Sequence, residues 1–239
     1  MRQSPCSNIT FHERCQEIHT SHNYDEEAFK HSRLALSIKT AVQLLYLQAI
    51  KWASERICQD LFDGEGKRAL DVGSAYGYAA SMLHSLRYHA VALDISKYAL
   101  RTGDKGNRIQ GDAHNLPIKS DSINIITCFD TLEHLKKPIQ LIRSSYRCLC
   151  QRGVLLIENP IANPIDAVSD KVHKMGEIHC SLLTASELTS LLLTTGFHTA
   201  KTTGLLPIPF QRFPVFGRFI EIQVPLSAAR RILIAATKD

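Results

Sequence analysis

The chain has 239 residues, of which 44% are hydrophobic and 21% are charged, and its formal net charge is +5. So many apolar residues exclude a disordered chain and suffice for one packed domain with additions. The basic residues are scattered, without the basic stripe typical of nucleic-acid-binding proteins, so we expect no nucleic-acid partner.

The cysteines and the lack of long apolar segments indicate a cytoplasmic protein. The seven cysteines form no Cys-x-x-Cys pair, so we expect reduced thiols and no structural zinc site. The first residues contain no apolar signal region. The longest apolar stretch, residues 41–53, is too short to cross a bilayer, and we expect no transmembrane span.

The first predicted unit, residues 1–60, combines a polar flap with one helix. Residues 1–35 are polar and irregular, and they form either a tail or a flap that orders over a site. Residues 37–60 repeat apolar side chains at helical spacing, which predicts a helix with a broad apolar face. That face consists of Leu44, Leu45, Leu47, Ile50 and Ile57.

Residues 61–239 are predicted to form the main domain, which begins with alternating strands and helices. The strands are short, apolar and β-branched, as strands buried on both faces must be. They are predicted at 69–73, 89–94, 108–112, 123–129 and 153–159. Helices are predicted at 77–85, from Ser96 onward, and at 138–150. This alternation indicates parallel strands joined by right-handed crossovers.

The last third of the chain has a different pattern. Residues 184–197 predict a helix capped by Thr184, with Glu187 completing a capping box and Gly196 ending the helix. Two further strands, joined by a long connection and pairing antiparallel, are predicted at 197–203 and 229–238. Together the elements predict an α/β fold with a doubly wound, Rossmann-like sheet. It has seven mostly parallel strands, an antiparallel last strand, and helices on both faces.

The loop after the first predicted strand, residues 71–77 with the sequence DVGSAYG, lies where ligands bind in open α/β sheets. Glycines let a ligand approach the backbone, and the following helix presents free N–H groups. A dinucleotide fingerprint, G-x-G-x-x-G, needs glycines where Ala75 and Tyr78 stand. The spacing D-x-G-x-x-x-G therefore does not fit a dinucleotide loop.

Two more acidic residues stand at predicted strand ends. Asp94 closes the second strand, and an acid at this place can accept hydrogen bonds from both ribose hydroxyls. Asp112 lies in the string GDAHNLP, which precedes an acid and an apolar strand. Singly, each acid would be an ordinary strand-end residue. Three acids at successive strand ends, in this order and spacing, indicate one ligand site.

These motifs resemble those of the class I S-adenosylmethionine-dependent methyltransferases, in the small-molecule group. The family's first motif is roughly E/D-x-G-x-G-x-G, and Ala75 stands at its central glycine. If the loop needs a positive φ there, cofactor binding is weakened; if it needs only a small residue, alanine serves. The resemblance places Asp94 at the ribose, Asp112 at the adenine and Phe129 near the cofactor.

The resemblance implies that the cofactor is S-adenosylmethionine and that the product is S-adenosylhomocysteine. The methionine part is expected over the 71–77 loop. The whole expected cofactor site comprises Asp71, Gly73, Ser74, Ala75, Gly77, Asp94, Ile95, Asp112, Ala113 and Phe129.

The resemblance also indicates where the acceptor lies. It places residues 129–135, FDTLEHL, beside the donor methyl group, so His134 is a candidate general base; its alternative role is to fix the loop. His179 is a second catalytic candidate, because similar family members often carry a histidine just before the 184–197 helix. No pair of acids and histidines has a metal-site spacing, so we expect no metal.

Two insertions, 160–183 and 204–228, are predicted to cap the substrate. The second repeats phenylalanine at every third position, at Phe210, Phe213, Phe216 and Phe219. These rings could pack on the sheet edge, line an apolar pocket, or touch a membrane surface. They favour an apolar acceptor over a highly charged one.

The sequence thus predicts an enzyme that transfers a methyl group from S-adenosylmethionine to a small-molecule, lipid-like or sugar acceptor through an oxygen, nitrogen or carbon nucleophile. Because the sulfonium is a good leaving group, positioning and desolvation can supply most of the catalysis of this in-line displacement. Two alternatives stay open: a nicotinamide-dependent oxidoreductase, and a binding protein with the same fold but no catalysis. The sequence does not indicate an oligomeric state.

Overall fold

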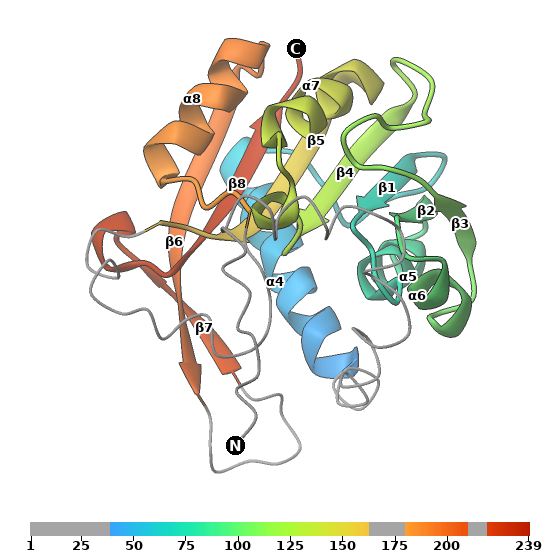
Figure 1. Cartoon of the computed structure of the whole chain (residues 1–239), viewed down its shortest axis with the longest axis horizontal. Helices are drawn as coiled ribbons and strands as arrows, with labels where there is room; N and C mark the ends of the chain where they lie inside the picture. The colour runs from blue at the N-terminus through green and yellow to red at the C-terminus, as the bar shows by residue number, and fades with distance from the viewer. Residues whose placement is uncertain (1–38, 163–179, 210–218) are drawn as a thin grey trace, which may run out of the picture.

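The computed structural model describes residues 39–162, 180–209 and 219–239 (Figure 1). Its centre is one sheet with the strand order β3-β2-β1-β4-β5-β8-β6-β7. The strands are β1 (Arg68–Val72), β2 (His89–Asp94), β3 (Asn107–Gln110), β4 (Ile123–Phe129), β5 (Leu149–Pro160), β6 (Thr199–Pro209), β7 (Phe219–Val224) and β8 (Arg231–Thr237). The α-helices are α4 (Lys39–Ile57), α5 (Tyr78–Ser85), α6 (Lys97–Thr102), α7 (Pro138–Cys148) and α8 (Ala185–Thr195). Short 3₁₀ turns are η1 (Leu132–His134) and η4 (Leu226–Ala228).

The sheet confirms the predicted doubly wound architecture. Strands β1 to β5 pair in parallel, and the chain order reverses between β1 and β4. At such a reversal the loops after the two strands diverge and leave a crevice in which ligands bind. Strand β8 is reversed, as predicted, and lies antiparallel between β5 and β6. The strands predicted at 89–94 and 123–129 have those bounds in the structure.

The described part of the sheet has one strand more than predicted. The predicted connection 204–228 contains the end of β6 and the whole of β7, which pair antiparallel from Gly204↔Val224 to Pro209↔Phe219. Prolines at 207 and 209 are unfavourable in a central strand, so the sequence did not predict a strand or this pairing here. Beyond Leu205, however, β6 pairs only with β7, so the prolines occupy a stretch with a single neighbouring strand.

Two apolar layers cover the sheet. Helices α7 and α8 pack on one face and α4 and α5 on the other (Figure 1). The helix predicted at 37–60 is present as α4, but its apolar face is buried only in the second half, where Ile50 and Trp52 lie. Leu44, which was predicted on that face, is 47% exposed. The N-terminal turns of α4 extend beyond the carboxyl ends of the strands, which explains the exposure (Figure 1).

Helix α8 has the predicted ends. The Thr184 hydroxyl accepts a hydrogen bond from the Glu187 backbone N–H, and the Glu187 carboxylate accepts one from the Thr184 N–H. Gly196 follows in the left-handed conformation, with φ 114°. These contacts confirm the capping box and satisfy backbone groups that the helix itself cannot pair. Within the described ranges, no helix has both the length and the apolar character needed to cross a bilayer.

Candidate functional site

The loop after β1 is folded tightly against the neighbouring strands. The backbone N–H groups of Gly73 and Ser74 both donate to the Leu93 carbonyl, at 2.9 and 3.0 Å. Gly73 has φ +70°, and a Cβ atom placed on it would lie 2.1 Å from Oγ1 of Thr131. Such an approach is sterically impossible without movement, so this position requires glycine. The loop therefore packs directly on the turn that follows β4.

Ala75, which stands at the central glycine of the family motif, has a positive φ, a conformation that favours glycine. Its φ is +45°, in the left-handed region that an L side chain disfavours by about 1–2 kcal/mol. Its backbone N–H donates to Oδ2 of Asp94 at 2.8 Å. Of the two possibilities left open by the sequence, the positive φ is the one observed. This turn therefore carries local backbone strain at Ala75.

Asp94 supports both the loop and the next helix. Besides the Ala75 contact, its Oδ1 accepts from the Ser96 N–H at 2.7 Å, and the side chain is buried. Burial raises the pKa of Asp94, and the backbone hydrogen bonds oppose that rise in part. A carboxylate has about four lone-pair positions, and the backbone N–H groups of Ala75, Ser96 and Ile95 occupy three of them. Asp94 therefore keeps acceptor capacity for a ribose hydroxyl.

Asp71 lies inside the fold beneath the loop. Its Oδ1 accepts from the Thr127 hydroxyl at 2.8 Å, and its Oδ2 accepts from the Ala80 N–H at 3.2 Å. The acid thereby joins β1, β4 and the first turn of α5. Because it is only 3% exposed, burial raises its pKa to about 7. Its predicted contact with the cofactor stays a prediction, while its support of the loop is visible.

The end of β3 completes this half of the crevice. Strand β3 ends at Gln110, so Asp112 stands on the loop beyond it, next to buried Ala113. The Gly111 N–H donates to the Asp94 carbonyl at 3.0 Å, which brings the ends of β2 and β3 together. The Asp112 side chain is 58% exposed and accepts from the His114 N–H at 2.8 Å. Ile95 lies between these acids in sequence, and its carbonyl accepts from the Gln110 amide at 3.2 Å.

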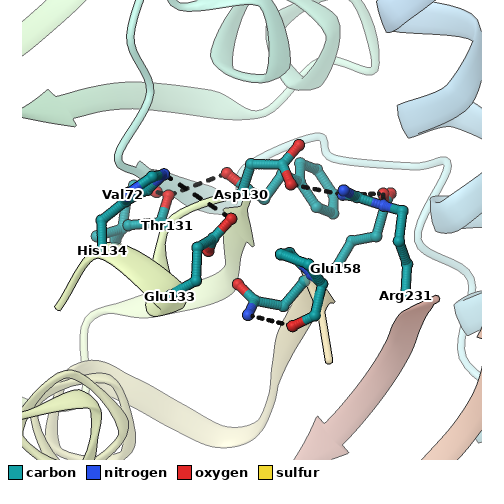
Figure 2. Close-up of polar contacts among 10 residues, drawn as sticks. Val72, Asp130, Thr131, Glu133, His134, Glu158 and Arg231 are labelled. Carbon is teal, nitrogen blue, oxygen red and sulfur yellow. Dashed lines mark hydrogen bonds and ion pairs between the residues drawn. The ribbon is translucent and has the colours of Figure 1, made fainter. Parts of the chain in front are cut away.

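The other side of the crevice contains a cluster of charged residues that the sequence did not predict (Figure 2). Arg231, the first residue of β8, donates from Nε and Nη2 to Oε1 of Glu158, at 3.0 and 2.7 Å. Its Nη2 also lies 2.6 Å from Oδ1 of Asp130, the residue after β4. In the sequence of β8, this cluster is indicated only by an arginine at the start of an otherwise apolar strand. Its partners depend on which strand lies beside β8.

Helix α4 supplies an aromatic side chain to the same region. The ring of Tyr46 stacks on Phe129, with centroids 4.4 Å apart and planes 13° from parallel. Burial raises the pKa of Tyr46 well above its usual range, and the nearby carboxylates of Asp130, Asp71 and Glu158 raise it further. Tyr46 is therefore a neutral phenol at physiological pH, and it forms a flat wall with Phe129.

Two further contacts fix α4 across the start of α5. Lys39 Nζ lies 2.6 Å from Oδ2 of Asp104, and the Gln43 amide donates to the Tyr78 carbonyl at 3.2 Å. The helix thus passes over the crevice from the α5 side to the β8 side.

The first predicted catalytic histidine, His134, lies in η1 beside the charged cluster (Figure 2). Its Nε2 is 3.8 Å from Oε1 of Glu133, and its side chain is 23% exposed. Glu133 is buried, and its carbonyl accepts from the backbone N–H groups of Cys180 and Ser181. These contacts are compatible with a loop-fixing role and with a general base, so both stay predictions. The second candidate, His179, lies outside the described residues, as does the phenylalanine repeat from 210 to 218.

The comparison with known protein families identifies the family of the chain. Residues 45–202 match the family described as "Methyltransferase domain". The chain belongs to the class I S-adenosylmethionine-dependent methyltransferases. This membership removes the support for a nicotinamide-dependent oxidoreductase, in agreement with Tyr78 in place of a fingerprint glycine.

Individual methyltransferases are distant relatives. A "Probable S-adenosylmethionine-dependent methyltransferase" of Mycolicibacterium smegmatis is 27% identical over 144 residues, covering 59% of this chain and 55% of the relative. A ubiquinone biosynthesis O-methyltransferase of Aliivibrio fischeri is 25% identical over 175 residues, covering 66% of this chain and 75% of the relative. The chain thus spans about half the length of the mycobacterial-type relatives it matches.

Solved structures agree on the fold. A crystal structure of a SAM-dependent methyltransferase from Thermotoga maritima superposes with a TM-score of 0.62 at 19% identity, covering 89% of this chain and 96% of that chain. The YcgJ protein of Bacillus subtilis gives a TM-score of 0.58 at 18% identity, covering 74% of this chain and 93% of that one. At this identity the likeness establishes the methyltransferase fold alone.

The residues of the loop fit the cofactor of the family. Gly73 and Gly77 take positive φ values, which keep the backbone free of side chains where a ligand approaches. The Ser74 hydroxyl is buried and has no hydrogen-bond partner within the described residues, so it can form a hydrogen bond with a ligand without breaking an existing one. The shape of the loop and the free acceptors of Ser74 and Asp94 are thus compatible with a nucleoside joined to a polar chain.

Proposed function

We propose that this protein transfers the methyl group of S-adenosylmethionine to a small-molecule acceptor by in-line displacement. The observation that carries the proposal is the contact between the Ala75 N–H and Asp94. It supports the proposal because it holds Asp94, the proposed ribose ligand, beside a loop that only glycine at 73 permits. When bound, the cofactor supplies an electrophilic methyl group on a sulfonium.

In this proposal each part of the crevice has a separate task. Asp94 binds the ribose through its remaining acceptor capacity, and Asp112 with Ala113 and Ile95 binds the adenine. Ser74 and the loop backbone bind the methionine part. The stacked rings of Tyr46 and Phe129 exclude water from the reacting side, which strengthens every electrostatic interaction there.

The acceptor is proposed to approach from the side of Glu158, Arg231 and Asp130. The apolar wall of Tyr46 and Phe129 supports an acceptor that carries an apolar portion. The similarity to ubiquinone biosynthesis O-methyltransferases points in the same direction, toward an oxygen nucleophile on such a molecule. His134 is proposed as the group that would receive a proton from that oxygen, because it lies in the turn that follows β4 and a neutral imidazole has a nitrogen that accepts a proton.

The proposal is tested by calorimetric titration of the full chain with S-adenosylhomocysteine. Asp94→Asn should bind S-adenosylhomocysteine at least about tenfold more weakly. The asparagine amide has only one acceptor oxygen, and its NH₂ group would face a backbone N–H that now donates to the carboxylate. Asp121→Asn is the matched control, because Asp121 is an exposed acid just before β4, at the amino-terminal end of the strand and away from the crevice. Absence of binding by the wild type, or equal binding by Asp94→Asn, would contradict the proposal.

A further inference from the structure

A second hollow of the molecule lies on the α5 face of the sheet, outside the crevice. Its floor is formed by Ala90 and Ala92 of β2, one wall by α5, and the opposite wall by the loop that leads from α6 into β3. The enclosed volume is about 210 Å³. Since an apolar cavity of roughly 150 Å³ holds a benzene molecule, this space accommodates one six-membered ring with a substituent. We call it the α5 pocket.

The α5 pocket is open because α6 is short and the surrounding side chains are small. Helix α6 has only six residues, and the described lining contains none of them. On the α5 side, Ala80 and Ser81 line the pocket with side chains no larger than that of serine. Ala80, Ala90 and Ala92 belong to one apolar layer of the fold. The inner part of the pocket is therefore apolar and uncovered.

Gly77 connects the α5 pocket to the loop of the proposed cofactor site. A Cβ atom placed on Gly77 would lie 3.9 Å from Cβ of Ala92 and 4.0 Å from Cβ of Asp104. The side-chain position of Gly77 therefore faces the pocket, while its backbone N–H closes the loop by donating to the Ser74 carbonyl at 2.7 Å. Gly77 is the one described lining residue that also belongs to the expected cofactor site. The pocket is thus a second site behind the loop.

The charges around the α5 pocket favour an anion. Its described lining contains Asp104, Lys105 and Arg108 as permanently charged residues. Asp104 is neutralised, because Lys39 Nζ lies 2.7 and 2.6 Å from its two carboxylate oxygens. Lys105 forms no hydrogen bond or ion pair with any described residue. Two cations therefore stand at the rim without a carboxylate partner among the described residues.

Arg108 is held in place at the edge of the floor. It pairs with Ala92 in the sheet, so its side chain starts beside the alanine floor. Its Nη1 donates to the Leu100 carbonyl, and its Nε donates to the Gly106 carbonyl at 3.3 Å. These bonds orient the guanidinium, and within the described residues they leave Nη2 available for a ligand. An arginine that is already ordered loses little conformational freedom when it binds an anion.

We infer that the α5 pocket binds a small molecule that has one apolar ring and one anionic group, such as an aromatic carboxylate. The ring lies on Ala90 and Ala92, and the anion is bound by Lys105 and Arg108. The ligand is a free molecule rather than a protein segment. None of the large apolar side chains that are exposed among the described residues lines the pocket, so a protein partner would find no further apolar contact there.

Titration of the full chain with three probes tests the ligand class. Benzoate has both features, benzamide has the ring without the charge, and acetate has the charge without the ring. Ligand-observed NMR should show saturable binding of benzoate, with benzamide at least about fivefold and acetate at least about tenfold weaker. Absence of saturable benzoate binding, or equal binding of benzamide or acetate, would overturn the inference.

Two matched pairs of variants locate the benzoate. Ser81→Leu fills the pocket from α5 and should abolish binding, whereas Ser85→Leu, the same change at an exposed position one turn later, should have no effect. Lys105→Gln should weaken binding about threefold, whereas Lys97→Gln, at an exposed lysine outside the lining, should not. Equal effects within either pair would refute the assignment.

The same titration with S-adenosylhomocysteine present separates the α5 pocket from the crevice. Benzoate should stay bound when S-adenosylhomocysteine is saturating, and its displacement would place benzoate in the crevice and overturn the inference. The inference does not depend on the proposed function. Benzoate binding by a chain that fails to bind S-adenosylhomocysteine would contradict the proposed function and still support the pocket.

Discussion

The backbone N–H of Ala75 donates to the carboxylate of Asp94 across 2.8 Å, and this bond holds an alanine in a left-handed conformation. The acid at the end of β2 thus determines the shape of the loop after β1. The same acid is the proposed ribose ligand. The loop geometry and the proposed nucleoside binding therefore depend on one side chain.

Replacing Ala75 by glycine should remove the strain of this loop. We expect Ala75→Gly to stabilise the protein by about 0.5–1 kcal/mol, because glycine populates positive φ freely. It should also tighten S-adenosylhomocysteine binding severalfold. Urea denaturation and calorimetry measure the two effects. Ala79→Gly, at a buried position in the first turn of α5, is the control and should destabilise by about 1 kcal/mol. A loss of stability in Ala75→Gly would show that the strain is absent.

The opposite substitution at Gly73 should prevent the loop from closing. In Gly73→Ala the new methyl would meet the Thr131 side chain, so we expect a loss of about 2 kcal/mol or more in stability together with loss of cofactor binding. Gly66→Ala is a matched control, since Gly66 has a similar φ of +69°, but a Cβ atom placed on it would have no atom within 4 Å. The control should cost only about 1 kcal/mol. Equal effects of the two substitutions would rule out the steric explanation.

Asp71 should make stability fall as the pH rises. Its carboxyl ionises near pH 3.8 when unfolded but near 7 when folded, so between these values the folded protein holds one more proton. The free energy of unfolding then decreases with pH, by at most about 1.4 kcal/mol per unit, and the loss is complete above the folded pKa. Asp71→Asn stays neutral and should remove this component.

The measurement is a comparison of urea denaturation between pH 5 and pH 8. The stability difference, Asp71→Asn minus wild type, should grow with pH and level off above about 7. Asp121→Asn, at an exposed acid, should give a difference that hardly depends on pH. A constant difference for Asp71→Asn would place the folded pKa near its ordinary value.

Removing Arg231 should leave Glu158 as a buried, uncompensated charge. Arg231→Met should destabilise by roughly 3 kcal/mol, and adding Glu158→Gln to it should restore part of the loss. Arg143→Met, at an exposed position on α7, should change stability by less than about 0.5 kcal/mol. The coupling is read from a double-mutant cycle. Additive effects at Arg231 and Glu158 would mean that the ion pair does not stabilise the fold.

The features that the sequence predicted correctly are determined by residues close together in the chain. Strand β2 and strand β4 have patterns of apolar residues that end at an acid or an aromatic ring, and α8 carries its caps at both ends. The positions of Asp94 and of the glycine loop follow from the same local patterns. Local propensity and the direction of parallel strands suffice for these elements.

The features that it missed join distant segments. Tyr46 and Phe129 lie 83 positions apart, and Glu158 and Arg231 lie 73 apart. Neither pair has a local pattern, because the contacts arise only after α4 crosses the sheet and β8 enters it. β7 was not predicted, because the two prolines of its partner strand β6 argue against a strand at that place. The conformation of Ala75 needed coordinates, since alanine by itself indicates a negative φ.

Strand β8 follows every other strand along the chain, yet it lies between β5 and β6. During synthesis both of those strands therefore have an open edge until residues 231–237 have emerged from the ribosome. The same residues bring in Arg231, so the acceptor side of the crevice is completed together with the sheet. A chain interrupted before β8 would expose two unpaired strand edges, which makes it a substrate for chaperones or for aggregation before it could be an enzyme.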